Sequence, residues 1–302
     1  MTALTFPEIT PTGPDVGSGT IRFGSDEHKR LFCKTLLDTF NPYRPAVIDW
    51  PKLEPVTQAR ITALPIWDIA VQTENRAGLN VCTYAEGVAD PLLRKAIELN
   101  GFEERRHRYV LSNLVEAYGI KLAPEPAYPR PRDPEWAFLV TGYSECIDSF
   151  FAFGLFETAK TSGFFPAELV DTFEPVIQEE GRHILFFVNW VAWHRRNMPL
   201  WRRPWFELKV LAVWIFLIYE RIGIASDVSH GQQDNNFTVN GASQLGGGDI
   251  DIYKLVDTCL REDSRRLGVY DKRLKRPRFV PFMMRSFRRF FGPRPAVAPS
   301  AT

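Results

Sequence analysis

The chain has 302 residues, of which 45% are hydrophobic and 24% charged, and its formal net charge is +1. This composition is typical of a globular protein with a sizeable core, and the near-zero charge indicates no electrostatic partner for the molecule as a whole. The four cysteines are far apart and form no Cys-x-x-Cys pair, which argues against a zinc knuckle, an iron–sulfur site and a disulfide framework. We therefore expect a reducing compartment, the cytoplasm.

Residues 1–60 are expected to form an N-terminal arm and one helix. The first 20 residues lack the basic and apolar regions of a signal peptide. Ser25 is a good capping residue for a helix that runs to Phe40. Five prolines between positions 42 and 65 predict a largely irregular or broken stretch after it.

Residues 61–225 are expected to form the main bundle, with four long helices and a fifth packed outside them. Asp90-Pro91 and Asp133-Pro134 each supply a capping residue and a first helical proline. A proline-rich connection, residues 119–132, joins the first pair of long helices to the second. The five expected helices are 66–88, 91–118, 134–161, 166–196 and 205–224. The longest apolar run, 210–219, is about half of what a membrane span needs.

Residues 226–302 are expected to hold a loop, a helix and a basic tail. The loop, to residue 249, is rich in Asn, Gln and Gly. Its Gly246-Gly247-Gly248 run lacks the Lys-Ser/Thr of a phosphate-binding loop, so we assign it no nucleotide role. The helix is expected at 250–267.

The string Glu-Glu-x-Arg-His occurs twice, at residues 103–107 and 179–183. Each copy contains Glu-x-x-His, and this spacing points a carboxylate and an imidazole off the same face of a helix. Both pairs interrupt the apolar stripe of their predicted helix and therefore face the core. An unpaired carboxylate is very unfavourable there, and a metal ion would remove that penalty. The four residues are Glu104, His107, Glu180 and His183.

Spacing adds one further glutamate to each pair. Glu74 lies 30 residues before Glu104, and the turn between their helices falls almost midway. Glu145 lies 35 residues before Glu180, again with a turn between them. Each pair therefore returns to nearly the same height in the bundle. Four carboxylates and two imidazoles suit two divalent ions, and this oxygen-rich set favours iron or manganese over zinc.

In this pattern, residues 66–196 resemble the ferritin-like di-iron carboxylate proteins. The repeated string is most similar to those of the bacterial multicomponent monooxygenases, the ribonucleotide reductase small subunit and the aminoarene N-oxygenases. The resemblance implies an all-α fold, a ferritin-like four-helix bundle with additional N- and C-terminal helices. It also implies a cofactor of two iron ions (Fe2+/Fe3+), with a mixed Mn/Fe or a manganese centre as alternatives. The implied metal ligands are Glu74, Glu104, His107, Glu145, Glu180 and His183.

The resemblance implies supporting roles for the neighbouring residues. Glu103 and Glu179 would each bind the histidine of the opposite string, because a ligand histidine needs its other ring N–H oriented. Arg106 and Arg182 would pair with these two glutamates; surface salt bridging is the alternative for all four. Ser149, one turn after Glu145, would relay protons, or it simply bonds to a carbonyl of its own helix.

Two family features are missing from the chain. The N-oxygenases carry a third histidine shortly before the last Glu-x-x-His, where Phe173 and Val176 stand here. Leu111 occupies the position of the reductase radical tyrosine. Both absences disfavour those two chemistries and favour an oxygenase with six ligands.

The residues in and around the expected bundle indicate a substrate, an electron donor and a surface contact. Phenylalanines crowd the helix at 134–161 and its exit, which is the ordinary pattern of a core and would also suit a channel for an apolar or lipid-like substrate. No flavin, Rossmann or iron–sulfur motif occurs, so electrons would come from an external donor. The tail 261–291 holds eleven Lys/Arg against three acids, interleaved with phenylalanines. It would contact the inner membrane face peripherally or pack on the bundle with a solvated basic face; nucleic acid is a less favoured partner.

The sequence thus predicts a non-haem di-iron oxidoreductase, an oxygenase or oxidase that activates O2 to oxidise an apolar or amphipathic organic substrate. The first alternative is a ferroxidase, a metal-handling protein or a peroxide-detoxifying protein of the same fold. The second is a non-catalytic, membrane-associated bundle, which leaves the six-residue ligand set without a purpose.

Overall fold

The computed structural model describes residues 19–64, 66–227 and 251–292, with no side-chain description for Ile69 and for residues 222–227. Every regular element in this part of the chain is a helix, as expected, and no strand occurs in it. The elements are α1 (Asp26–Asp38), η1 (Pro45–Val47), α2 (Pro55–Thr62), α3 (Trp67–Glu86), α4 (Pro91–Ala117), α5 (Pro134–Ser162), α6 (Ala167–Asn197), η2 (Leu200–Arg202), α7 (Arg203–Asp227), α9 (Ile252–Gly268) and α10 (Phe279–Phe291).

The helix boundaries follow from local chemistry. Asp90 accepts a hydrogen bond from the backbone N–H of Leu93 at 2.9 Å, and Asp133 does the same for Trp136 at 3.0 Å. Proline follows each cap, at a position whose N–H would have no helical partner. Gly163 ends α5 with a φ of 67°, the left-handed conformation that glycine adopts without strain.

The segment after α1 is more regular than its prolines predict. Pro45 begins the short helix η1 and Pro55 begins α2. Proline is compatible with both, because the first turn of a helix has no use for the missing N–H. The basic tail is also ordered in part, since α10 covers its second half.

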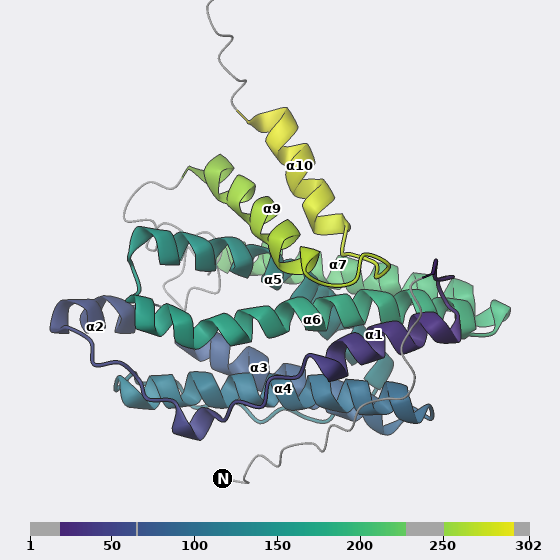
Figure 1. The fold of residues 1–302 in the computed structure, drawn as a ribbon, viewed down its shortest axis with the longest axis horizontal. Coiled ribbons are helices and arrows are strands. Elements are labelled where there is room, and N and C mark those ends of the chain that lie inside the picture. Colours follow the sequence, from purple (N-terminus) through teal and green to yellow (C-terminus); the bar gives the residue numbers. More distant parts are fainter. Residues whose placement is uncertain (1–18, 65, 228–250, 293–302) are drawn as a thin grey trace, which may run out of the picture.

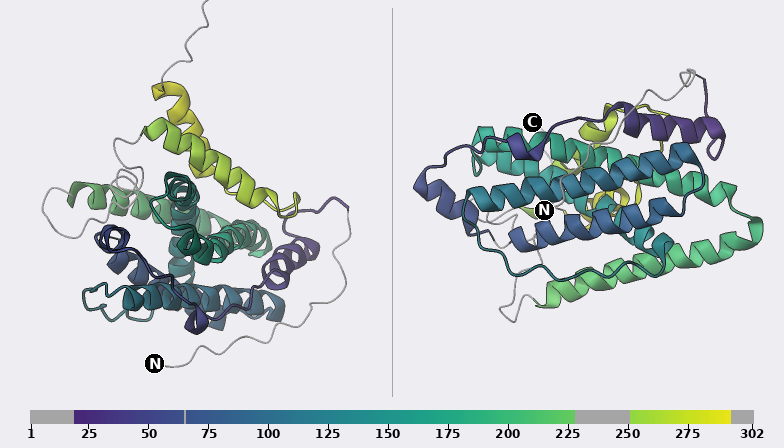
Figure 2. Two further views of the ribbon diagram at one scale, coloured as in Figure 1. Left: turned by 60° about the vertical axis from the view of Figure 1, so that its left-hand side comes forward. Right: turned by 90° about the horizontal axis from the view of Figure 1, so that it is seen from below.

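The long helices α3, α4, α5 and α6 lie side by side and form the centre of the molecule (Figure 1). The helix α3 packs along α4 and α5, and α5 packs along α6. Around them, α1 contacts α4 and α6, α9 contacts α5, and α7 runs along one side of the molecule (Figure 2). This arrangement places all four long helices around one interior.

The interior has a polar layer between two apolar clusters. Along α3, α4 and α6, the apolar residues on one side of the expected ligands belong to one cluster and those on the other side to the second. Representative pairs are Val81 and Val71 on α3, Ile97 and Leu114 on α4, and Trp190 and Leu169 on α6. The apolar clusters hold the helices together and leave the glutamates and histidines facing each other.

Some expectations fall outside the described residues. They are the N-terminal arm as far as residue 18, the loop 228–250 with its three glycines, and the last ten residues of the basic tail. Within the described part of the chain, no helix combines the length and the apolar character needed to cross a membrane.

Candidate metal centre

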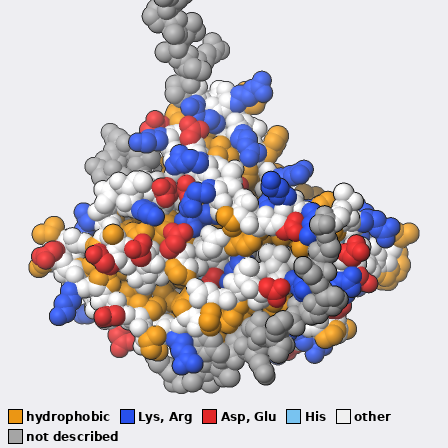
Figure 3. Space-filling view, viewed as in Figure 1, with side chains coloured by type: hydrophobic (Ala, Val, Ile, Leu, Met, Phe, Trp, Pro, Cys, Tyr) orange, Lys and Arg blue, Asp and Glu red, His pale blue; other side chains and the backbone are white. Residues whose placement is uncertain are grey.

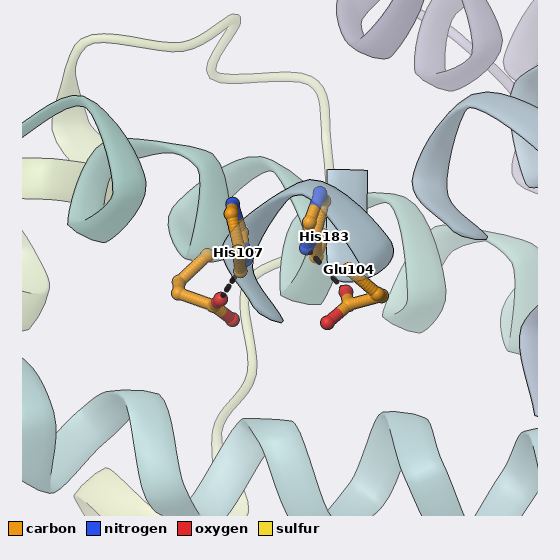
Figure 4. Close-up of side chains that lie close together, drawn as sticks. Glu104, His107 and His183 are labelled. Carbon is orange, nitrogen blue, oxygen red and sulfur yellow. Dashed lines mark ion pairs between the residues drawn. The ribbon is translucent and has the colours of Figure 1, made fainter. Parts of the chain in front are cut away.

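The two Glu-Glu-x-Arg-His strings face each other across the interior from α4 and α6. One ligand atom from each of Glu104, His107, Glu180 and His183 lies within 4.8 Å of the others, a group that could hold a metal ion. Figure 4 shows the imidazoles of His107 and His183 side by side, with the carboxylate of Glu104 turned toward His183. The two ring centroids are 5.6 Å apart.

The contacts between the strings are reciprocal. Nε2 of His107 lies 2.8 Å from Glu179, and Nε2 of His183 lies 2.8 Å from Glu103. The other ring nitrogen, Nδ1, lies 3.0 Å from Glu180 in His107 and 2.7 Å from Glu104 in His183. Each histidine therefore contacts the two consecutive glutamates of the opposite string, so the site has approximate two-fold symmetry.

The arginines extend this symmetry outward. Arg106 donates to Glu179 at 2.7 Å, and Arg182 donates to Glu103 at 2.7 Å. Both arginines and both glutamates are buried. The resemblance implies pairing of these arginines with the two glutamates but does not specify which arginine meets which; the pairs are crossed, and their burial distinguishes them from surface salt bridges. Each glutamate holds its histidine by accepting from Nε2, which in a neutral ring leaves the lone pair on Nδ1.

Several buried polar atoms at the centre have no hydrogen-bond partner: Nδ1 of His107, Nδ1 of His183, Oε2 of Glu74 and Oε1 of Glu145. These atoms come from all four long helices. Buried polar atoms without partners are rare in proteins, and a cation is one of the few things that satisfies nitrogen lone pairs and carboxylates together. Four of the six expected ligands therefore form a compact group that fits a metal ion, and Glu74 and Glu145 add unpartnered carboxylate oxygens from the other two helices.

The short distances between the histidine nitrogens and the carboxylate oxygens also fit a bound cation. Nδ1 of His107 and Nδ1 of His183 lie 3.0 and 2.7 Å from carboxylate oxygens, yet neither nitrogen makes a hydrogen bond of acceptable geometry. Two atoms that bind one ion at about 2.1 Å each, at a right angle, lie about 3 Å apart. The spacing therefore fits neighbouring ligands on a shared ion. Without an ion, burial lowers the pKa of both histidines, but the facing glutamates outweigh it and raise each pKa well above its usual value.

The electrostatics of the site also favour cations. Burial, together with the charges of Glu104 and Glu180, raises the pKa of Glu74 to about 8 against the opposing effect of His107. Burial and the same two charges raise the pKa of Glu145 well above its usual range. Without a cation, these carboxylates cannot all be ionised so close together. A divalent ion would restore the charged form of each.

The pKa of Glu103, which lies behind His183 as seen from the centre of the site, is lowered instead of raised. Burial alone would raise its pKa, but the hydrogen bond from His183 and the charge of Arg182 outweigh burial and lower the pKa to about 2. Glu103 is therefore a permanent anion at neutral pH, and it keeps the Nε2 proton of His183 in place. The contact fixes the orientation of the His183 ring.

The centre is not completely sealed from solvent. The side chains of Glu74 and Glu180 remain 21% and 14% exposed, whereas His107 and His183 are fully buried. Glu145 is also partly exposed, so solvent reaches the centre from the side of these carboxylates, and the two imidazoles lie deeper. A separate surface cavity of about 720 Å³ lies at the α3–α4 turn, lined by residues that include Tyr84, Trp193 and His194, and none of the six expected ligands lines it.

The remaining predicted residues and histidines occupy distinct places. Ser149 is buried on α5, one turn after Glu145. His194 pairs with Glu135 at 3.0 Å, and His28 contacts Asn189 at 2.9 Å. These two histidines therefore have partners of their own outside the cluster.

The N-terminal region supplies supporting residues that the sequence analysis missed. The hydroxyl of Tyr43 donates to Glu179 at 3.2 Å, and the guanidinium of Arg106 lies 3.9 Å from the centre of the Tyr43 ring. Arg106 also donates to the backbone carbonyl of Asn41 at 2.6 Å, and Arg182 to that of Leu36 at 3.0 Å. No local pattern signals contacts between segments so far apart in the chain.

Comparison with known proteins leaves the family of this chain open. No protein-family model matches it, and neither the curated proteins nor the solved structures contain a significant match. The case for a metal centre therefore rests on the geometry above.

Proposed function

We propose that this chain is a ferritin-like protein that binds two divalent metal ions, iron in the first instance, in the interior of α3, α4, α5 and α6. The observation that carries the proposal is the set of unpartnered buried atoms on His107, His183, Glu74 and Glu145, one from each helix. His107 would bind one ion together with Glu180 and Glu74, whose carboxylate oxygens lie 3.0 and 3.6 Å from its Nδ1. His183 and Glu104 would belong mainly to the other.

We further propose that the centre serves an oxygenase or oxidase that acts on an apolar organic substrate. Bound iron would supply the electrons that reduce dioxygen, and an external donor would return them. The outer ring of Glu103, Glu179 and their arginines supports a catalytic centre, because it fixes both histidines rigidly. Ser149, buried beside the Glu145 turn of α5, is the proposed proton relay.

The decisive experiment is metal analysis of the purified protein after anaerobic loading with ferrous iron. We expect about two ions per chain, from the ligand count. The Glu104→Ala/His183→Ala variant should lose most of this metal. A matched control is Glu135→Ala/His194→Ala, because these residues also form a Glu–His contact on α5 and α6, away from the cluster. Full occupancy in the first variant, or no metal in the wild type, would refute the centre.

A second measurement separates the oxygenase from a ferroxidase or metal-handling protein. The reduced, loaded protein is exposed to oxygen while further ferrous iron is supplied. An oxygenase or oxidase should oxidise only its own two ions, whereas a ferroxidase should oxidise many per chain. The Ser149→Ala variant should keep its metal and lose turnover if this hydroxyl relays protons.

A further inference from the structure

The helix α7 presents an apolar face to solvent. Five large apolar side chains are between 48% and 77% exposed: Leu208, Leu211, Ile215, Ile218 and Tyr219. The first four are three or four residues apart, and Tyr219 lies four residues after Ile215, so all five share one side of the helix. The opposite face, with Val210, Val213 and Leu217, is buried against the bundle. A helix on the surface of a globular protein normally carries polar residues on its outer face. This helix is apolar on both faces, which indicates that its outer face has a partner.

The helix α10 repeats the pattern with a basic border. Its exposed residues Phe279, Phe282, Met283 and Phe290 follow helical spacing, while Val280 is buried. Phe287, on the inner side, stacks with Tyr253 of α9 at 5.9 Å. Arg285 and Arg289 are exposed beside this stripe, whereas Arg288 turns inward and pairs with Asp257 of α9 at 3.1 Å. The outer side of α10 is therefore both apolar and basic.

The helices α7 and α10 touch at the edge of these stripes. The ring of Trp214 on α7 lies 4.5 Å from the ring of Phe279 on α10. Next to the start of α7, Trp201 and Trp205 are 72% and 70% exposed, with Arg202 and Arg203 between them. We call this combined surface the α7/α10 face. Figure 3 shows the Lys and Arg side chains that gather over α9 and α10, at the upper end of the molecule.

The charge pattern identifies the kind of partner. No Asp or Glu occurs between Lys272 and Gly292. The exposed side of α10 carries Arg285 and Arg289, while Arg273 and Arg288 pair with Asp271 and Asp257. A second copy of this chain, docked through the same face, would bring these positive charges against each other. Single-stranded nucleic acid would match the charge, but it binds on stacking aromatic platforms, and the α7 stripe is mostly aliphatic. An anionic lipid surface matches both features, with tryptophans placed where they favour the membrane interface.

We propose that the α7/α10 face docks the protein on an anionic phospholipid bilayer, with the apolar stripes in the headgroup region and the arginines against lipid phosphates. The apolar stripes would supply the insertion and the arginines the preference for negative charge. This inference is independent of the proposed di-iron chemistry, since it uses no residue of the metal centre.

The test is co-sedimentation of the full chain with vesicles of phosphatidylcholine alone and of phosphatidylcholine mixed with phosphatidylserine. We expect binding to the mixed vesicles only. Two double variants should each weaken binding to the mixed vesicles. Leu211→Ser/Ile215→Ser should lower the affinity by more than about tenfold, because apolar burial is lost. Arg285→Gln/Arg289→Gln should lower it by about fivefold per charge. Circular dichroism of each variant establishes that it is folded.

A matched control separates this face from general surface effects. Val56→Ser with Lys121→Gln removes one apolar and one basic side chain from other exposed positions, on α2 and on the α4–α5 connection. This variant should bind like the wild type. Brominated lipid should quench tryptophan fluorescence in the wild type, and less in Trp201→Phe/Trp205→Phe.

Three results would overturn the proposal. The first is a wild type that does not bind the mixed vesicles. The second is unchanged binding by the folded Leu211→Ser/Ile215→Ser variant. The third is a wild-type dimer, or a complex with single-stranded RNA, that Phe282→Ser/Phe290→Ser disrupts while vesicle binding is unaffected.

Discussion

Replacing Glu103 with glutamine should destabilise the protein and weaken its metal centre together. The glutamate is fully buried, and it accepts from Arg182 at 2.7 Å and from His183 at 2.8 Å. Glutamine has nearly the same shape but no charge, so the variant removes the closer counter-ion of the buried Arg182 and leaves it with Glu179, 3.6 Å away. Removing one member of a buried ion pair typically costs about 3–5 kcal/mol.

A loss of that size is a large fraction of the stability of an ordinary domain, about 5–15 kcal/mol. For a protein of this length it should lower the melting temperature by roughly 10 °C. The approximate two-fold symmetry of the site predicts a similar loss for Glu179→Gln, since Arg106 and His107 occupy the equivalent positions. Metal affinity should fall about 10–100-fold in either variant, because the ligand histidine loses the acceptor that orients it.

The assay is thermal unfolding followed by circular dichroism, with a chelator present so that metal binding does not contribute to the stability. The control is Glu86→Gln, since Glu86 pairs with Arg130 at the surface and both side chains are more than half exposed. This control should change the free energy of unfolding by less than about 1 kcal/mol.

A double variant isolates the buried pair. Glu103→Leu combined with Arg182→Met removes both charges, and it should be more stable than Glu103→Leu alone. If Glu103→Gln melts within about 1 °C of the Glu86→Gln control, the outer ring does not contribute the stability that burial and geometry indicate.

The remaining predictions concern packing and a buried acid. Gly154→Ala should destabilise the protein by about 1–3 kcal/mol in chemical denaturation, because the new methyl would lie 2.2 Å from the sulfur of Cys259 and 2.9 Å from its backbone. The control is Gly268→Ala, which has nothing within 4 Å and should be neutral or stabilising. Equal losses of stability in both variants would contradict the close contact of α5 and α9. Burial raises the pKa of Asp263 to about 6, and its Oδ1 has no partner. The folded state therefore holds this proton more tightly than the unfolded state, so stability falls as pH rises toward and through 6. Asp263→Asn should consequently stabilise the protein by roughly 1–2 kcal/mol at pH 8 and very little at pH 4, and an equal effect at both values in denaturation curves would contradict this.

Local sequence information was sufficient for most helix boundaries and for the composition of the cluster. Proline after a capping aspartate marks the starts of α4 and α5, since both signals act within one helical turn. Helical periodicity placed Glu104 and His107 on the inner face of α4. The position of the α3–α4 turn then brought Glu74 level with them. All of these inferences depend on the geometry of a helix, which is the same wherever the helix lies in a fold.

Predictions from local sequence were less reliable for prolines, which can break a helix or begin one, and for apolar residues, which can be buried or exposed. Pro55 was expected to break structure, and it begins α2 instead. The helix α7 was expected to pack outside the bundle, and its hydrophobicity alone did not indicate that Leu208, Leu211 and Ile215 would remain exposed. Burial is decided by neighbouring elements, and periodicity does not specify which elements those are.

By itself, the sequence determined which residues form the polar layer, because the repeated Glu-Glu-x-Arg-His and its partner glutamates are spaced by helix and turn geometry. Only the tertiary structure decided that Nδ1 of each histidine faces a carboxylate at the centre without a well-formed hydrogen bond, and that Tyr43 and the carbonyls of Leu36 and Asn41 hold the outer ring. The contact of Arg182 with Leu36 joins residues 146 positions apart. Contacts at that separation depend on how whole helices pack, and no local spacing encodes them.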